Sequence, residues 1–563
     1  MSAVWVAGLV DVLMALAFYL PISTGVLFIV PISSMGMGAY GAAELAIHGT
    51  PTFVCIMAGA AFGFAFAVVG GLVVLRLKTW SGAIASLAVV EIVQVIFQKI
   101  NAIGGAQGLY GVPLFTHLST ALIVVVPILV VLLVLEMTRT GNVVEAVRSD
   151  SLAADCAGIS VNRVRMAVFA FSGALAGLAG ALSTGFLGFV EPGSYGFAQI
   201  NQFLLATILG GSTTAVGSLL GGVTVNGLPH VLGFLSSYTL LVFSLVVVAV
   251  MLVRPEGLIS RRRVKRVIQG TLPLKQLRHR VDRGPAPAGR ERPVLRGAER
   301  EIRTLTATSL SKSFGGADVL SAVDLEVHTG EVLGIIGANG AGKTTLVNVL
   351  TGVVRADSGS VAVGRGSGLR SIPRLRPRKA VRLGIARTFQ NGRLYTGLTV
   401  GEHVSLLSGV DGRRLLELVG LNGREDEMAA DMPYGDQRRL EIARALATKP
   451  DFLILDEPAA GMTRAEAAEV ADLIRTLTAD GVGVLLIDHN VDFVSGISGR
   501  LVAMDFGQVV VAGPPSTVLS DKRVIDAYLG SETGRLGVDS ENVDAADVKS
   551  SEHDIASRTD SSL

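Results

Sequence analysis

The chain has 563 residues, enough for more than one domain, and 50% of them are apolar. Its mean hydropathy of +0.53 excludes an ordinary soluble enzyme. A net charge of +2, without a basic module interleaved with aromatic residues, gives no support for nucleic-acid binding. The two cysteines, Cys55 and Cys156, exclude a disulfide framework and fit a reducing cytosol.

The charged residues divide the chain into two unlike halves. Only 15 of them precede Arg254, although the whole chain carries 49 basic and 47 acidic residues. Most of the apolar runs before Arg254 approach the roughly 20 residues that a helix needs to cross a bilayer. We therefore predict an all-α membrane domain over residues 1–253, with about eight segments. The runs lie near residues 3–20, 53–75, 83–97, 118–135, 166–190, 203–225 and 231–253, with a less certain stretch at 22–47.

The basic loops predict the orientation, because cytosolic loops of membrane proteins are rich in Lys and Arg. Three apolar runs separate the basic loop at Arg165 from the one at Arg254, so one of the three cannot be a simple crossing. The run 203–225 is interrupted by Gly210 and Gly211. We expect it to be a re-entrant or two-legged segment, which is tolerated at membrane depth where protein or a cavity surrounds it.

Polar residues inside these runs need a partner or a wet path, because an ion at the centre of a membrane helix costs about 2.5–3.5 kcal/mol. Glu91, Gln94 and Gln98 are spaced to share one helical face, which we expect to turn inward. They indicate either a path for a polar solute or helix-to-helix hydrogen bonding, and the second is slightly favoured. Gly173 and Gly177 are expected to serve close helix packing.

Two further segments have the composition of connecting or terminal chain. Residues 254–303 hold 15 basic and 5 acidic residues with several prolines, which predicts a linker attracted to the anionic lipid of the inner leaflet. Residues 531–563 are rich in Ser, Asp and Glu and poor in large apolar residues, which predicts a disordered tail.

A phosphate-binding motif stands in the second half. Residues 337–344 fit G-x-x-x-x-G-K-[ST], follow the apolar run 332–336 and open a helix-like stretch. The glycines let backbone N–H groups approach phosphate oxygens, while Lys343 reaches the terminal phosphates and the Thr344 hydroxyl can ligate Mg²⁺. We predict an ATP and Mg²⁺ site that includes Gly337, Ala338, Asn339, Gly340, Ala341, Gly342, Lys343, Thr344 and Thr345.

Two acids and a histidine follow apolar runs further along the chain. Residues 452–455 are typical of a buried strand and end in Asp456 and Glu457, which can divide the work between Mg²⁺ and the attacking water. The alternative, a solvated acidic loop, is disfavoured by the phosphate loop. His489 follows the apolar run 484–487, where a histidine taken alone is more often ordinary than catalytic.

Residues 304–530 resemble the nucleotide-binding domain of ATP-binding cassette (ABC) transporters, in particular the ATPase of branched-chain amino-acid importers. The matching stretches are 337–344, 387–390, 434–446, 455–461, 487–489 and 524–530. The resemblance implies an α/β P-loop ATPase in which Phe314 stacks on adenine. It also implies that Gln390 contacts the metal and couples to the membrane domain, that Glu457 is catalytic, and that His489 touches the γ-phosphate.

The first half resembles the permease of the same importer family, at residues 75–78, 104–113, 145–159, 209–211 and 254–258. The resemblance implies that residues 141–165 form the cytosolic coupling segment that docks on the ATPase. Permease and ATPase are usually separate chains in that family, whereas here they are fused.

Three departures from the family pattern stand in the second half. The signature motif, which would serve the nucleotide of a facing cassette, departs at two positions, and one hypothesis is slower hydrolysis there. Thr463 stands where an aspartate is usual, and only 44 positions separate Gln390 from the signature, which predicts a trimmed helical subdomain. The signature residues are Pro433, Tyr434, Gly435, Asp436 and Gln437, with a proline in place of serine and Asp436 in place of an amide.

The leading hypothesis is ATP-driven import of branched-chain or similar apolar amino acids across the cytoplasmic membrane, with urea or short amides as alternative solutes. Rivals are an exporter half-transporter and a membrane ATPase with a regulatory role. The chain supplies one permease and one cassette, so we expect a second of each, with unlike partners favoured over a homodimer. An extracytoplasmic binding protein is expected to deliver the solute, and the ATPase is expected in the cytosol.

Overall fold

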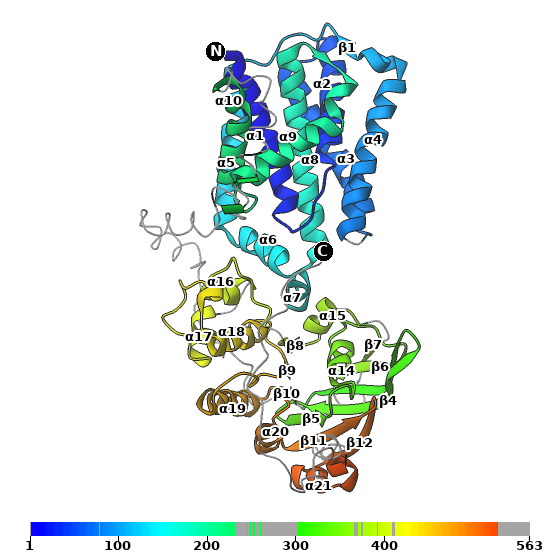
Figure 1. The fold of residues 1–563 in the computed structure, drawn as a ribbon, viewed down its shortest axis with the longest axis vertical. Coiled ribbons are helices and arrows are strands. Elements are labelled where there is room, and N and C mark those ends of the chain that lie inside the picture. The colour runs from blue at the N-terminus through cyan, green and yellow to red at the C-terminus, as the bar shows by residue number, and fades with distance from the viewer. Residues whose placement is uncertain are drawn as a thin grey trace, which may run out of the picture.

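The computed structural model describes residues 2–77, 79–231, 302–364, 370–372, 375–390, 392–407 and 411–526, with a few single positions between 245 and 259. A bundle of apolar helices, the helical part (2–231), stands above an α/β part (302–526) (Figure 1). The predicted fold class is confirmed. Most of the predicted run 231–253 lies outside the described residues. Nearly all of the linker 254–303 and the whole of the tail 531–563 lie outside them as well.

Five described helices of the helical part are long and apolar enough to cross a membrane: α1, α3, α4, α5 and α8. The helices are α1 Ser2–Ile22, α2 Pro31–Ile47, α3 Thr52–Val74, α4 Thr79–Lys99, α5 Leu118–Met137, α6 Arg139–Ser149, α7 Ser151–Cys156, α8 Val161–Leu187, α9 Phe197–Gly210 and α10 Ala215–Val231. Two short strands, β1 Leu109–Tyr110 and β2 Phe189–Val190, pair antiparallel near the end that lies away from the α/β part (Figure 1).

Glycines allow α2, α3 and α8 to pack at very short range. The less certain stretch 22–47 contains α2, which packs extensively on α8 and α3. A Cβ atom on Gly38 or Gly63 would overlap the backbone of α8, and one on Gly177 would overlap the carbonyl oxygen of Gly59. Small residues let membrane helices approach this closely. The packing role predicted for Gly173 and Gly177 is confirmed.

The apolar run 203–225 is broken at the predicted place. Helix α9 ends at Gly210, Gly211 adopts φ +126°, and α10 folds back along α9. A Cβ atom on Gly221 would overlap the carbonyl oxygen of Ala206, so this hairpin needs a glycine where its two legs touch. The run therefore forms two packed helices in place of one.

The close helix packing predicts that Gly177→Ala destabilises the helical part by about 1–3 kcal/mol, because the added methyl group has no space. An alanine in a helix normally stabilises relative to glycine, so the sign of the effect is diagnostic. Trp5 and Trp80 are the chain's two tryptophans and both lie in the helical part, so thermal unfolding followed by tryptophan fluorescence in detergent measures this effect.

Gly193→Ala is the control, because nothing lies within 4 Å of a Cβ atom at that position. An unchanged melting temperature for Gly177→Ala would contradict the packing role.

The α/β part is built on two sheets. The larger has the order β12-β11-β5-β10-β9-β8 and is parallel except for its edge strand β12, and the smaller, β4-β3-β6-β7, is antiparallel. The strands are β3 Thr304–Phe314, β4 Ala317–His328, β5 Val332–Gly337, β6 Ser358–Gly364, β7 Arg370–Ile372, β8 Ile385–Arg387, β9 Phe452–Asp456, β10 Gly483–Ile487, β11 Arg500–Asp505 and β12 Gln508–Gly513. The helices are α14 Lys343–Leu350, α15 Pro377–Arg382, α16 Val400–Ser405, α17 Gly412–Leu418, α18 Tyr434–Leu446, α19 Arg464–Ala479, α20 Val491–Ile497 and α21 Pro515–Leu519.

The register of the larger sheet brings the predicted site together. Strands β9 and β10 are buried along their whole length, as expected for parallel strands covered on both faces. Ile487 at the end of β10 pairs with Asp456 at the end of β9 and with Ile335 near the end of β5. Because parallel strands end at one edge, the segments that follow these three strands meet there.

Helices α6 and α7 connect the two parts (Figure 1). Arg139 donates to the carbonyl oxygen of Ser405 at 2.8 Å, and Arg393 pairs with Asp150 at 3.0 Å. Burial raises the pKa of the Cys156 thiol to about 12, as expected for a well-desolvated contact. A cluster of buried, mostly apolar residues excludes water from the contact between the two parts. Its members are Ala146, Val147, Ala153, Ala154, Cys156 and Ile159 from the helical part and Phe389, Tyr395, Leu398 and Leu406 from the α/β part.

Candidate active site

The phosphate loop leads from β5 into α14. Gly340 and Gly342 adopt φ of +88° and +96°, and a side chain on Gly342 would approach the backbone of Val319. The Lys343 ammonium donates to the carbonyl oxygens of Gly337 at 2.6 Å and Ala338 at 2.9 Å. Burial lowers the pKa of Lys343, and the acids at the strand edge oppose that effect. The loop residues Ala338, Asn339, Gly340 and Thr344 stay at least partly accessible.

Asp456, at the end of β9, is a buried carboxylate with an incomplete set of partners. It is 1% exposed, and neither of its oxygens accepts a hydrogen bond from the described residues. The Arg387 guanidinium lies 3.5 Å away, an ion pair that burial outweighs, so the pKa of Asp456 is raised. Two unsatisfied carboxylate oxygens facing a phosphate loop fit the oxygen-ligand chemistry of a divalent cation.

Two other predicted residues, Gln390 and His489, converge on Glu457. Its Oε1 atom accepts from Nε2 of Gln390 at 2.9 Å and lies 2.6 Å from Nε2 of His489. Its φ of +51° is unusual for a residue with a side chain, and its N–H donates to the carbonyl oxygen of Ile487 at 2.7 Å. The backbone is therefore held by β10 in the conformation that presents this carboxylate beside Gln390 and His489.

The signature residues open α18, where Pro433 takes the N-cap position without a capping side chain. The Asp436 carboxylate forms ion pairs with Arg424 and, at 3.1 Å, with Arg439. Two guanidinium groups therefore balance the charge that the sequence placed in the signature. Arg439 also pairs with Glu469 at 3.0 Å, so the helix start is fixed to α19.

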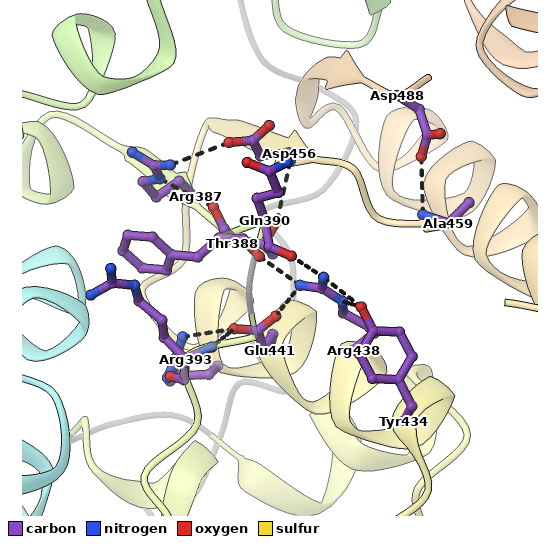
Figure 2. A network of polar contacts seen from close by, with 12 residues as sticks. Arg387, Thr388, Gln390, Arg393, Tyr434, Arg438, Glu441, Asp456, Ala459 and Asp488 are labelled. Carbon is purple, nitrogen blue, oxygen red and sulfur yellow. Dashed lines mark hydrogen bonds and ion pairs between the residues drawn. The ribbon is translucent and has the colours of Figure 1, made fainter. Parts of the chain in front are cut away.

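Sequence reasoning missed a buried network that ties α18 to the segment after β8 (Figure 2). The Arg438 guanidinium donates to the carbonyl oxygen of Phe389 at 2.6 Å and to that of Gln390, and it pairs with Glu441 at 3.0 Å. Glu441 accepts from the N–H of Arg393 at 2.6 Å. The i,i+3 spacing of Arg438 and Glu441 was the available signal, but exposed helix faces show the same spacing.

Thr463 caps a helix, and Phe314 is exposed at a turn. Thr463 caps α19 in a capping box with Glu466, so the position that departs from the family pattern starts a helix. Phe314 is 49% exposed at the β3–β4 turn, and the Lys312 ammonium lies 5.0 Å from its ring centre. The ring is accessible to a planar ligand.

The predicted inward orientation of the polar residues on α4 is wrong. Glu91 and Gln98 are exposed on α4 and do not face inward, while Gln94 is half-buried against Gly196. No helix-to-helix hydrogen bond of these three side chains is found within the described residues. Apolar residues take the inner face of α4, namely Val90, Val93 and Phe97.

The burial of Asp456 without a hydrogen bond predicts that Asp456→Asn raises the unfolding free energy of the nucleotide-free and metal-free α/β part by about 1–3 kcal/mol. Arg387 keeps its bonds to Asn348 and Thr351 in the variant. Because the folded pKa is raised, the gain is largest at neutral pH and disappears as the pH falls toward the ordinary pKa of aspartate. Calorimetry of the full chain measures both effects.

Asp451→Asn is the matched control, because Asp451 is also buried but pairs with Arg303. The control should lower stability, and a loss of similar size in Asp456→Asn would contradict the interpretation.

Comparisons with known proteins agree with this geometry. The family model described as ABC transporter matches residues 320–460, and the model of the permease component of branched-chain amino acid transport systems matches residues 1–254. The high-affinity branched-chain amino acid transport ATP-binding protein LivG of Escherichia coli (strain K12) is 35% identical over 252 residues, covering 40% of this chain and 97% of LivG.

Two further matches extend over the α/β part. The lipopolysaccharide export system ATP-binding protein LptB of Acidithiobacillus ferridurans is 36% identical over 238 residues, covering 40% of this chain and 97% of LptB. A crystal structure of the ADP conformation of an ATP-binding cassette is 30% identical with a TM-score of 0.37, covering 40% of this chain and 99% of that one. The chain belongs to the ABC transporter family and joins a permease domain of the branched-chain amino acid type to an ATP-hydrolysing cassette.

Proposed function

We infer that this chain is the fused permease and ATPase subunit of an importer for branched-chain or similar apolar amino acids in the cytoplasmic membrane. One observation carries the proposed coupling of ATP hydrolysis to transport. A continuous series of contacts leads from Glu457 through Gln390, Arg438 and Glu441 to Arg393, which pairs with Asp150. The site expected to hydrolyse ATP is thus mechanically connected to the helical part.

The residues of the site have distinct proposed tasks. The backbone of residues 337–345 and Lys343 hold the phosphates, and Phe314 stacks on adenine. Thr344, Gln390 and Asp456 would hold Mg²⁺, which offsets charge on the phosphate oxygens. Glu457 polarises the attacking water and His489 contacts the γ-phosphate.

Coupling follows from how the cassette holds Asp150. The Asp150 carboxylate caps α7 by accepting from the N–H of Ala153 at 2.8 Å, and it also pairs with Arg393. A shift of the segment that carries Gln390 and Arg393 therefore displaces α7, which continues into α8. We assign residues 141–165 as the coupling segment.

The complete transporter needs more than one chain. A second cassette would face this one so that each signature meets the other's nucleotide, and a second permease would complete the solute path. The balanced charge of Asp436 supports a signature that tolerates a facing phosphate. We propose unlike partner subunits and an extracytoplasmic binding protein, with the cassette in the cytosol.

The proposed solute and the proposed direction of transport are supported mainly by the helical part. Its match to permease components of branched-chain amino acid systems supports import of such solutes, with urea or short amides as alternatives. The cassette alone does not decide the direction, because it resembles both LivG and the export protein LptB. Few charges precede Arg254, which disfavours the long charged cytosolic helices of exporters.

The proposal predicts ATP-dependent uptake of radiolabelled leucine by proteoliposomes that contain the chain, its partner subunits and the binding protein. Glu457→Gln should lower both ATP hydrolysis and uptake at least a hundredfold, because the amide cannot polarise water. Glu417→Gln is the control, since Glu417 is exposed on α17. Uptake by Glu457→Gln at the wild-type rate would contradict the catalytic role, and ATP hydrolysis without any uptake would favour a regulatory ATPase.

Loss of the ion pair between the two parts is predicted to uncouple solute uptake from ATP hydrolysis. Arg393→Gln should reduce uptake about tenfold and ATP hydrolysis much less, because the pair lies outside the nucleotide site. Asp150→Asn should behave alike, since asparagine can still cap α7. The ratio of leucine taken up to ATP hydrolysed measures this effect, with Arg523→Gln, whose recorded ion pair is local to Asp521, as the control. An unchanged ratio in both variants would exclude coupling through this pair.

A further inference from the structure

Helix α4 presents one face to the bundle and one face outward. Its inner face packs through Phe97, whose ring centre lies 4.6 Å from that of Tyr40. Its outer face is mostly apolar and well exposed, with Ile84 at 69% and Ile92 at 57%. Glu91 is exposed beside Ile92. In Figure 1, α4 lies at the margin of the helical part.

The depth of Glu91 makes its exposure informative. It stands twelve residues after Thr79 and eight before Lys99, which at about 1.5 Å per residue places it roughly 18 Å and 12 Å from the two helix ends. The hydrocarbon layer is about 30 Å thick, so the carboxylate lies near its middle. A glutamate side chain is too short to reach either surface from there, and hydrocarbon is a costly environment for it.

No described residue of the chain offers compensation. Glu91 has no recorded ion pair or hydrogen bond within the described residues, and Lys99 stands two helical turns away. Gln94, one turn on, lies against Gly196, where a Cβ atom would overlap the Gln94 amide. A polar amide therefore lies one helical turn from a carboxylate that needs a cation.

We propose that a second permease subunit covers this face of α4 and that Glu91 pairs with the ammonium group of the solute in the path between the two subunits. The proposal rests on the function proposed above and names the chemical class of the solute, a molecule with a protonated amino group. The mid-depth carboxylate disfavours lipid as the occupant, because hydrocarbon is a costly environment for a charge. The apolar residues around Glu91 suit a protein surface that seals a narrow polar path.

The sign of the charge selects the solute group. A zwitterionic amino acid offers one ammonium group and one carboxylate, and only the first is attracted by Glu91. The Gln94 amide can donate to the solute carboxylate or accept from its ammonium group, so it fits either end. Neutral urea has no ammonium group and gains nothing from this carboxylate.

Leucine uptake by the complete complex in proteoliposomes tests the solute contact. Glu91→Gln should slow uptake of radiolabelled leucine at least tenfold, and Glu91→Asp, which keeps the charge, should retain at least a third of the wild-type rate. Glu44→Gln is the matched control, because Glu44 is exposed near the end of α2 and should leave uptake unchanged. Co-elution of the subunits and the tryptophan melting curve show whether each variant is assembled and folded.

Photo-crosslinking tests the surface separately. A benzoylphenylalanine placed at Ala88, exposed one turn from Glu91, should crosslink to a second permease polypeptide that mass spectrometry identifies. The same group at Ile123 on α5, which is 72% exposed, is the control and should not. Crosslinks from Ala88 to lipid alone would overturn the proposed surface whatever the uptake result.

The remaining outcomes separate the two proposals. Wild-type uptake of leucine with an equal rate in Glu91→Gln overturns the ammonium contact and leaves the proposed importer intact. Loss of subunit co-elution in Glu91→Gln also overturns it, because the carboxylate would then join the subunits. Wild-type uptake of urea in place of leucine overturns both the proposed solute and the ammonium contact, whereas absence of any ATP-driven uptake overturns the importer itself.

Discussion

The seating of α6 and α7 on the α/β part is the contact on which the rest of the described structure depends. It combines an apolar cluster, which excludes water, with the ion pair of Asp150 and Arg393 at its edge. The apolar surfaces hold the two parts together, and the ion pair fixes their relative position. Because Arg393 belongs to the network of Arg438 and Glu441, an unbroken series of contacts joins the segment that carries Gln390 to Asp150 of the helical part.

Two residues of the nucleotide site lower the stability of the fold. Asp456 is buried without a hydrogen bond, and Glu457 adopts a backbone conformation that costs free energy. The buried and paired strands β5, β9 and β10 stabilise the fold enough to offset both features. The rigid sheet therefore fixes two carboxylates in positions that a flexible loop would not maintain, and Gln390 and His489 add contacts to one of them.

The two parts pack in different ways. In the helical part glycine backbones contact one another, whereas in the α/β part large apolar side chains fill the core. Gly38, Gly63 and Gly177 bring three helices together so closely that they leave no space for side chains between them. Helix α4, outside this glycine contact, exposes Glu91 among apolar neighbours.

The two halves, the phosphate loop, the acids at the strand end and the glycine break at Gly210 could all be predicted from the sequence, because each depends on local patterns of polarity and backbone freedom. The direction that Glu91 faces, the ion pair of Asp436 with Arg424, and the link that Arg438 makes between the signature helix and the segment after β8 depend on how the chain packs. The spacing of residues on one helix defines a face, but the neighbouring elements decide what that face meets. Partners 12 to nearly 250 positions apart, such as Asp436 with Arg424 and Asp150 with Arg393, come together only when the chain has packed.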